Sequence, residues 1–198
     1  MRKLLLFIFF VIMAPVLYNL DAIYGAWKFS RLCKNEGGPR FYSKVDRNIG
    51  WLVIDINQKD SSLSYQRPFR FHDIAFVRWR RNNGVEFDVY VNSPPVGAEY
   101  SGGYWFSPID KSKIVKYEYR YVSAVMHDDR YGKTVHKIID IENGQVAAEY
   151  TIFSFQWAKP ERVILNAPTV TSCWDGQTRR EQEIYYNFFK NIFNGKAE

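Results

Sequence analysis

The stretch from Ile114 to Trp157 constrains the fold most, because apolar and polar residues alternate there through three successive runs. Alternation with a period of two is typical of β-strands that bury one face. The first run is IVKYEYRYVSAVM, in which one face carries Val115, Tyr117, Tyr119 and Tyr121. The turns HDDRYGK and ENGQ separate this run from TVHKIIDI and from VAAEYTIFSFQW. We therefore predict a three-strand antiparallel meander.

Further strands are predicted upstream of this meander. The runs FRFHDIAFVRWRR and VEFDVYVN flank NNG, and its Asn-Gly pair favours a tight hairpin turn. RFYSKV and GWLVIDIN also have a strand-like composition. Residues 93–108 are rich in Pro, Gly and Ser, which predicts a long loop.

Helices are predicted at both ends of the chain. The first runs up to EGGP, whose glycines and proline stop a helix, and the second follows Thr178 and has an apolar face. The expected fold class is therefore α+β: an antiparallel β-sheet, built as a meander with hairpins, with an N-terminal helix and a C-terminal amphipathic helix. A half-open barrel is the neighbouring alternative.

An apolar leader indicates export. Arg2 and Lys3 precede the fourteen uncharged residues LLLFIFFVIMAPVL at positions 4–17, and a basic start before an apolar run is typical of export signals. Small residues suited to signal cleavage are poorly placed after it, so a retained anchor is favoured over a cleaved peptide. We expect residues 1–26 to be a membrane anchor or signal peptide and residues 27–198 to be a single extracytoplasmic α+β domain.

The charge distribution around the leader predicts its orientation. Basic residues stay on the cytoplasmic side, so the expected protein crosses the bacterial inner membrane once, with its domain in the periplasm. Cleavage of the leader would instead release a soluble periplasmic domain. Tyr18, Tyr24 and Trp27 resemble the aromatic belt of a membrane interface.

The two cysteines, Cys33 and Cys173, lack the local spacing of a zinc site or a redox pair. The residues SRL before Cys33 lack the small residue that lipid attachment requires. A catalytic thiolate would need a nearby base, and no sequence pattern places a histidine beside either cysteine. Because cysteines of exported domains usually pair in an oxidising compartment, we predict a disulfide between Cys33 and Cys173.

No sequence motif specifies a reaction. Glycine-rich phosphate loops, nucleophile elbows and His-Glu-x-x-His motifs do not occur. The turn HDDRYGK could hold a metal, and Glu86 with Asp88 could act as paired carboxylates, but turn capping and strand alternation also explain these residues. We therefore predict no catalytic residue, no metal site and no cofactor.

Two aromatic segments are candidate binding sites. Arginines alternate with aromatic residues in RPFRFHDIAFVRWRR, a pattern that can bind polyanions. The candidate anion-binding residues are Arg67, Arg70, Arg78, Arg80 and Arg81. Export argues against nucleic acid as the partner, and a solvated strand face with edge arginines is the structural alternative. In EYSGGYWF, the residues Tyr100, Tyr104 and Trp105 could stack on a sugar or a peptide, or could fill the core.

Three segments of the chain resemble a group of small uncharacterised bacterial proteins: FSRLCKNEGGPRFYSKV, HKIIDIENGQVAAEYTIFSFQW and TSCWDG. Those proteins have an N-terminal apolar segment, a Leu-Cys pair followed by an acidic residue and glycine, and a late cysteine. The resemblance implies a bacterial exported protein with paired cysteines. It implies no activity, catalytic residue or cofactor.

Together these features predict a non-enzymatic envelope protein that acts as a binding or accessory module. Its expected partners are the membrane, through the N-terminal helix, and an envelope protein or an anionic polymer. One alternative is a small envelope hydrolase that uses carboxylate or histidine residues. Another is an anchored subunit of a larger membrane complex.

Overall fold

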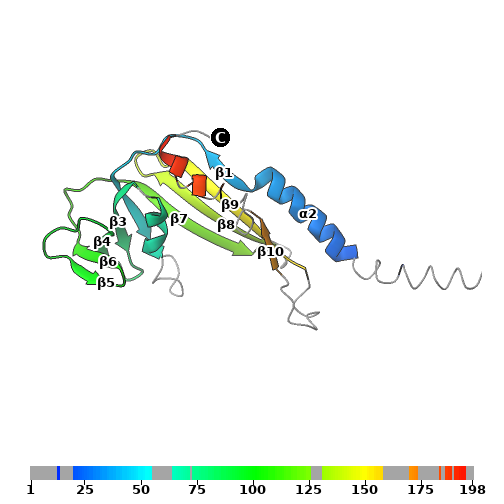
Figure 1. Cartoon of the computed structure of the whole chain (residues 1–198), viewed down its shortest axis with the longest axis horizontal. Coiled ribbons are helices and arrows are strands. Elements are labelled where there is room, and N and C mark those ends of the chain that lie inside the picture. The colour runs from blue at the N-terminus through cyan, green and yellow to red at the C-terminus, as the bar shows by residue number, and fades with distance from the viewer. Residues whose placement is uncertain are drawn as a thin grey trace, which may run out of the picture.

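The structure is a computed structural model that describes residues 13, 20–54, 64–71, 73–125, 131–157, 170–173, 183, 186–188 and 190–194. These residues form one elongated body around a single sheet (Figure 1). Helix α2 (Leu20–Glu36) lies at one end of the long axis, and the strands formed by residues 86–108 lie at the other.

Ten strands of the described residues join in the sheet. They are β1 (Gly38–Phe41), β2 (Ile49–Ile54), β3 (Ile74–Arg80), β4 (Glu86–Tyr90), β5 (Glu99–Ser101), β6 (Tyr104–Pro108), β7 (Val115–Val125), β8 (Tyr131–Asp140), β9 (Val146–Gln156) and β10 (Val170–Cys173). Their order is β1-β9-β8-β7-β2-β3-β4-β6-β5, and β10 also pairs with β9. A 3-10 helix, η1 (Ser64–Arg70), lies between β2 and β3 in the chain. A second, η3 (Ile192–Asn194), lies near the C-terminus.

The expected α+β fold with an antiparallel sheet is wrong, because the structure is mainly a mixed β-sheet with few helices. The central strand β2 runs parallel to both of its neighbours, β3 and β7. The chain between Ile54 and Ile74 contains η1 and is long enough to cross over the sheet. Such a crossover brings the next strand back in a parallel direction, whereas a tight turn brings it back antiparallel.

The predicted hairpins lie within this mixed sheet. Strands β7, β8 and β9 pair antiparallel in chain order, and β3 pairs antiparallel with β4 across the NNG turn. Residues 93–108 contain the hairpin β5–β6, so the prediction of a long loop there is wrong. Gly102 and Gly103 form its turn with φ values of 60° and 89°, which glycine adopts without a steric cost.

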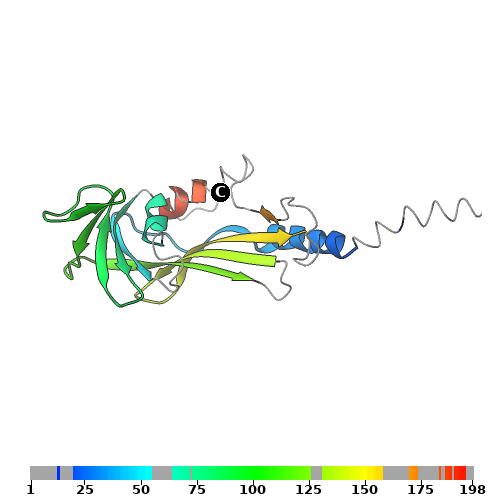
Figure 2. The ribbon, with the colours of Figure 1, turned by 90° about the horizontal axis from the view of Figure 1, so that it is seen from below.

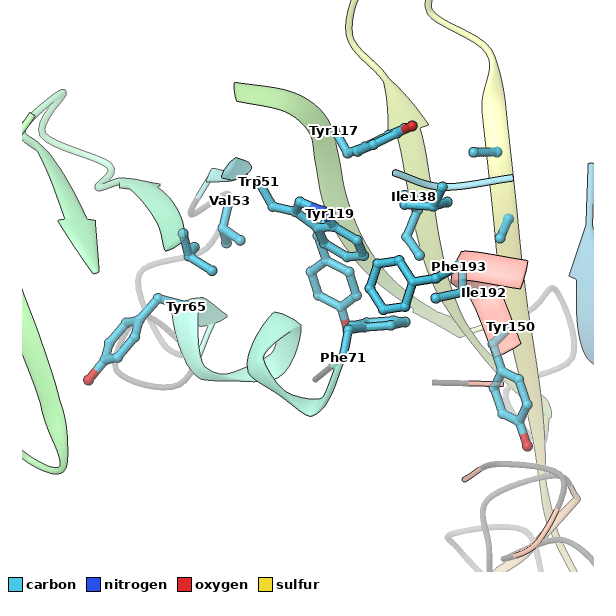
Figure 3. Packing of buried hydrophobic residues seen from close by; sticks show 14 of the residues in the cluster. Trp51, Val53, Tyr65, Phe71, Tyr117, Tyr119, Ile138, Tyr150, Ile192 and Phe193 are labelled. Atoms are coloured by element: carbon cyan, nitrogen blue, oxygen red, sulfur yellow. The ribbon is translucent and has the colours of Figure 1, made fainter. Parts of the chain in front are cut away.

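Most of the core lies on the inner face of the sheet, which η1 and the C-terminal helical residues cover (Figure 2). Trp51 of β2 lies between Phe71 and Phe193, with ring centroids 4.9 and 6.5 Å away, as Figure 3 shows. Phe188 packs on Tyr150 of β9 at 5.1 Å. Aromatic side chains from three distant parts of the chain therefore hold this layer together.

Helix α2 packs on the opposite face, near the ends of β8 and β9. Phe29 joins a second buried cluster with Tyr131, Phe153 and Phe155. Gly25 lies so close to Phe155 that an added Cβ would be 2.8 Å from the ring, and its carbonyl accepts a 3.0 Å hydrogen bond from the Tyr131 hydroxyl. The small residue lets the helix approach the sheet closely.

The predicted disulfide between Cys33 and Cys173 is confirmed, and it joins Cα atoms 5.9 Å apart. It ties α2 to the end of β10. Strand β10 pairs with residues 153–156 of β9, and β1 pairs with residues 148–151. The two short strands therefore follow each other along one edge of β9.

No helix within the described ranges is both long and apolar enough to cross a membrane. The apolar run at positions 4–17 lies outside those ranges except for Met13, and α2 continues through the expected boundary between residues 26 and 27. Of the predicted C-terminal helix, the structure describes residues 183, 186–188 and 190–194, which are helical.

Candidate functional site

Four aromatic side chains form a row across the end of the sheet farthest from α2. Trp105 of β6 lies opposite Tyr90 of β4 on one side and opposite Tyr100 of β5 on the other. Phe76 of β3 continues the row, with its ring stacked 5.8 Å from that of Tyr90. We call Phe76, Tyr90, Tyr100 and Trp105 the distal aromatic row. Side chains alternate along a strand, so this row and the inner core lie on opposite faces.

The buried end of the row packs against Gly50 of β2, which pairs with Phe76. A Cβ at Gly50 would lie 2.3 Å from the Phe76 ring and 2.8 Å from the carbonyl oxygen of Ile114. The ring therefore occupies the space that a side chain would fill. Phe76 and Tyr90 are both 4% exposed, so this end of the row is buried.

The outer end of the row is open to solvent. Tyr100 is 63% exposed and its ring centroid lies 4.9 Å from that of Trp105, with an angle of 55° between the planes. Tyr100 lies two residues before the Gly102–Gly103 turn and Trp105 two residues after it, on strands that hydrogen-bond to each other. The hairpin backbone thus holds two large aromatic side chains in a fixed relation on the surface.

Cationic groups border the buried end of the row. The Lys113 ammonium donates a 2.8 Å hydrogen bond to the Tyr90 hydroxyl and lies 4.8 Å from the centroid of that ring. The hydrogen bond to Tyr90 raises the pKa of Lys113 above its usual value. The Arg78 guanidinium lies 5.6 Å from the Phe76 ring centroid. Both cations are therefore engaged with aromatic rings of the row.

A buried ion pair frames the site. Asp88 has no exposed surface, and its two oxygens accept hydrogen bonds of 2.7 and 3.0 Å from Arg78. The backbone N–H of Asp110 donates a third bond of 3.0 Å to Asp88, and Arg78 donates to the Asp110 carbonyl at 2.7 Å. The hydrogen bonds to Asp88 raise the pKa of Arg78, and the bonds with the Asp110 backbone fix the loop before β7 against the β3–β4 hairpin.

Of the five arginines of the predicted anion site, the four whose side chains the structure describes do not converge. Arg78 and Arg80 share the outer face, but each is paired with a carboxylate, Asp88 and Glu86 respectively. Arg67 of η1 lies on the inner face, where its guanidinium is 3.5 Å from the Tyr121 ring centroid. The remaining two arginines are Arg81, which lies 5.2 Å over the Trp79 ring, and Arg70, whose side chain is outside the described part of the structure.

The three candidate stacking residues also divide between the two faces. Tyr100 and Trp105 belong to the distal aromatic row, whereas Tyr104 points to the inner core. There it contacts Tyr65 edge to face at 5.3 Å and Phe69 at 5.6 Å. The prediction of a stacking surface therefore applies to two of the three side chains, and core packing accounts for the third.

The residues considered for catalysis are dispersed. His136 is 7% exposed and lies 2.6 Å from the Tyr119 hydroxyl on the inner face. Glu86 and Asp88 form the ion pairs described above, and His72 and most of the HDDRYGK turn lie outside the described residues. Among the residues that the structure does describe, no group of three or more His, Cys, Asp or Glu side chains could hold a metal.

Comparison with known proteins found no matching family model, no matching curated protein and no matching solved structure.

Sequence reasoning identified the exposed end of the row but missed its buried end. Phe76, Tyr90 and Lys113 come from three separate segments: the pairing of β3 with β4 brings the two rings together, and the loop before β7 brings Lys113 to Tyr90. One local signal was present: Tyr90 continues the outward-facing set that contains Glu86 and Asp88. An aromatic residue at the end of a polar strand face indicates a neighbour that covers it.

Proposed function

We propose that this chain is a non-enzymatic binding module of the bacterial envelope, tethered to the inner membrane by its N-terminal segment. The tether is supported by Arg2 and Lys3 ahead of the apolar run at positions 4–17. The disulfide between Cys33 and Cys173 supports an oxidising compartment such as the periplasm. The observation that carries the binding role is the exposed Tyr100 ring, which packs against the half-buried Trp105 ring on the surface of the β5–β6 hairpin.

Two properties suit this pair to binding. Tyr and Trp offer large contact areas with few rotatable bonds, so less conformational entropy is lost when they become buried. The Gly102–Gly103 hairpin and the buried rings of Phe76 and Tyr90 hold the pair in place before a partner arrives. Exposed aromatic side chains with rigid support are typical anchors of protein interfaces.

The proposed partner is a protein of the envelope rather than an anionic polymer. The cations nearest the row are engaged, since Arg78 pairs with Asp88 and Lys113 bonds to Tyr90. Tyr100 also lies on β5, the last strand in the order of the sheet, whose three residues are all exposed. A strand at the end of a sheet can pair with an extended segment of another chain.

Photo-cross-linking tests this proposal. The photoreactive residue p-benzoylphenylalanine is placed at Tyr100 in the full chain, and cells of the native host are irradiated. We expect a cross-linked product of higher mass that protease digestion destroys. The same substitution at Tyr42, which directly follows β1 and is 58% exposed, should give no such product.

The outcomes separate the alternatives. A protease-resistant product at position 100 would identify a polymer and contradict the protein partner. Equal products at both positions would indicate non-specific proximity, and the absence of any product at position 100 would contradict a partner at this surface. A set of several proteins linked at position 100 would favour a subunit of a larger complex.

A further inference from the structure

The outward side of α2 carries an apolar stripe in its first two turns. Leu20, Ile23, Tyr24 and Trp27 recur at intervals of three and four residues, which places them on one helix face. Their exposed fractions are 49%, 53%, 63% and 53%. The rings of Tyr24 and Trp27 lie 5.8 Å apart. We call these four residues the α2 stripe.

Basic residues continue the same face toward the end of the helix. Arg31 lies one turn after Trp27, and its guanidinium is 5.0 Å from the centroid of that ring. Lys34 follows in the last turn and is exposed. The outward face therefore changes from apolar to cationic along the helix axis.

The stripe cannot turn inward, because the other side of α2 is fixed to the sheet. Gly25 contacts Phe155 and bonds to Tyr131, Phe29 is 8% exposed in the second cluster, and Cys33 is bonded to Cys173. Rotation of the helix about its axis would break all of these contacts.

We infer that the α2 stripe lies in the headgroup region of an anionic phospholipid bilayer. Leu20 and Ile23 would reach the acyl boundary, Tyr24 and Trp27 the interface, and Arg31 with Lys34 the lipid phosphates. This is the usual depth order of apolar, aromatic and basic residues where a helix emerges from a bilayer. The inference rests on the membrane tether of the proposed function and adds a second contact.

The position of the stripe in the chain favours a bilayer over a second copy of the protein. Leu20 comes three residues after the apolar run at positions 4–17, so a chain anchored by that run brings the stripe to the membrane surface. Val170, which pairs with Gln156 at the α2 end of β9, and Trp157, which directly follows β9, are 56% and 44% exposed. Anionic headgroups would complement Arg31 and Lys34, whereas parallel pairing with a second copy would bring like charges together.

Fluorescence quenching in vesicles tests the inference. The full chain is reconstituted into vesicles of phosphatidylglycerol and phosphatidylcholine, with and without bromine atoms on the acyl chains. Brominated lipid quenches tryptophans that lie at the boundary. We expect Trp27→Phe to remove most of the lipid-dependent quenching. The matched control Trp105→Phe, at the opposite end of the molecule, should leave the quenching unchanged.

Flotation of the same vesicles measures whether the protein is attached to the membrane at all, and so distinguishes the proposed tether from the proposed α2 contact. Protein that floats with the vesicles but is quenched equally with and without Trp27 would overturn the α2 contact and leave the tether intact. Protein that does not float would overturn both. Cross-linking between two copies through residue 27, without quenching, would assign the stripe to a dimer and overturn the bilayer contact. Thermal unfolding of each variant confirms that the fold is retained.

Discussion

Asp88 is the most constrained charged residue that the structure describes. It is fully buried, and every bond to its oxygens comes from Arg78 or from the Asp110 backbone. A buried pair of this kind contributes little when compared with an apolar pair, but removing one partner leaves the other charge buried and uncompensated. Its main effect is therefore to make the position of the loop before β7 depend on a single carboxylate.

Asp88→Ala is expected to lower the free energy of unfolding by about 3–5 kcal/mol. Urea denaturation followed by far-UV circular dichroism measures the loss. Glu86→Ala is the matched control, because Glu86 pairs with Arg80 on the same strand face in a more exposed setting. The free energy of unfolding of Glu86→Ala should fall by about 1 kcal/mol or less. An equal fall in both variants would contradict the structural role of Asp88.

Asp46 should contribute to acid sensitivity. A hydrogen bond from Lys116 is the main cause that lowers the pKa of Asp46. Because the folded pKa is below the unfolded one, the contribution is present above the unfolded value, at roughly pH 4, and is lost as the pH falls through the folded pKa. The pair is largely exposed, so we expect about 0.5 kcal/mol at pH 7 after allowing for solvent screening.

Urea midpoints measured from pH 2 to 7 check this expectation. The difference between the native chain and Asp46→Asn should be largest at neutral pH and should vanish at the acid end. Lys116→Met should reproduce the same profile, because it removes the other partner of the pair. A difference that does not change with pH would count against the ion pair.

At the scale of single elements, β2 depends on the absence of a side chain at Gly50. Gly50→Ala would place Cβ against both the Phe76 ring and the backbone oxygen of Ile114. We expect a loss of about 1–3 kcal/mol from overpacking, measured by thermal unfolding. Phe76→Ala combined with Gly50→Ala should lose less than the sum of the two single changes, and strict additivity would be evidence against contact between these residues.

The disulfide joins two elements that are 140 residues apart in the chain. The chain-entropy estimate for so long a loop is about 5 kcal/mol, which is an upper value because structure in the unfolded chain reduces it. Cys33→Ala with Cys173→Ala should therefore lower the urea midpoint strongly. Addition of a reductant should lower the midpoint of the native chain and leave that of the double variant unchanged; no effect of the reductant on the native chain would contradict this role.

Local elements could be predicted from the sequence, and their assembly could not. The hairpin at NNG and the three-strand meander follow from turn residues and alternation within short segments. The parallel partners of β2 begin at residues 74 and 115, so no local pattern reports them. Residues 93–108 are rich in Pro, Gly and Ser, so their composition predicts a loop rather than the hairpin β5–β6. The Gly102–Gly103 pair is the one local feature that indicates a hairpin turn there.

The candidate site divides in the same way. Tyr100 and Trp105 flank one turn and were identified together. Phe76, Tyr90 and Lys113 come together only when separate strands and the loop before β7 assemble. The separation of Arg67 from Arg78 and Arg80 on opposite faces likewise depends on how distant segments pack. The disulfide was predictable because only two cysteines exist and the leader indicates an oxidising destination.

At the scale of the whole molecule, the proposed partner surface and the α2 stripe lie at opposite ends of the long axis (Figure 1). A chain held to the bilayer by α2 and the segment before it would present the Tyr100–Trp105 pair away from the membrane surface. This arrangement suits contact with a protein whose binding segment stands off the bilayer.

Tyr100→Ala with Trp105→Ala should abolish the cross-link to the partner, with the photoreactive residue moved to Ser107, which lies two residues after Trp105 on the same face of β6. Loss of the exposed Tyr100 side chain should change the free energy of unfolding little, whereas loss of the half-buried Trp105 ring should lower it moderately. Tyr104→Ala is the control from the same hairpin. It removes a ring packed against Tyr65, so we expect about 2 kcal/mol of destabilisation with the cross-link retained. The reverse result would place the partner surface on the inner face.

The pairing of β1 with β9 also constrains the order in which the chain folds. The partner residues of β1 are 148–151, and β2 requires β7, so neither of the first two strands can complete its pairing early in synthesis. Contacts between segments so distant in sequence form slowly. An emerging chain therefore remains without its finished sheet until most of it has been made. If the chain is exported unfolded through a translocation channel, as the proposed function implies, this strand order would delay completion of the sheet until after export.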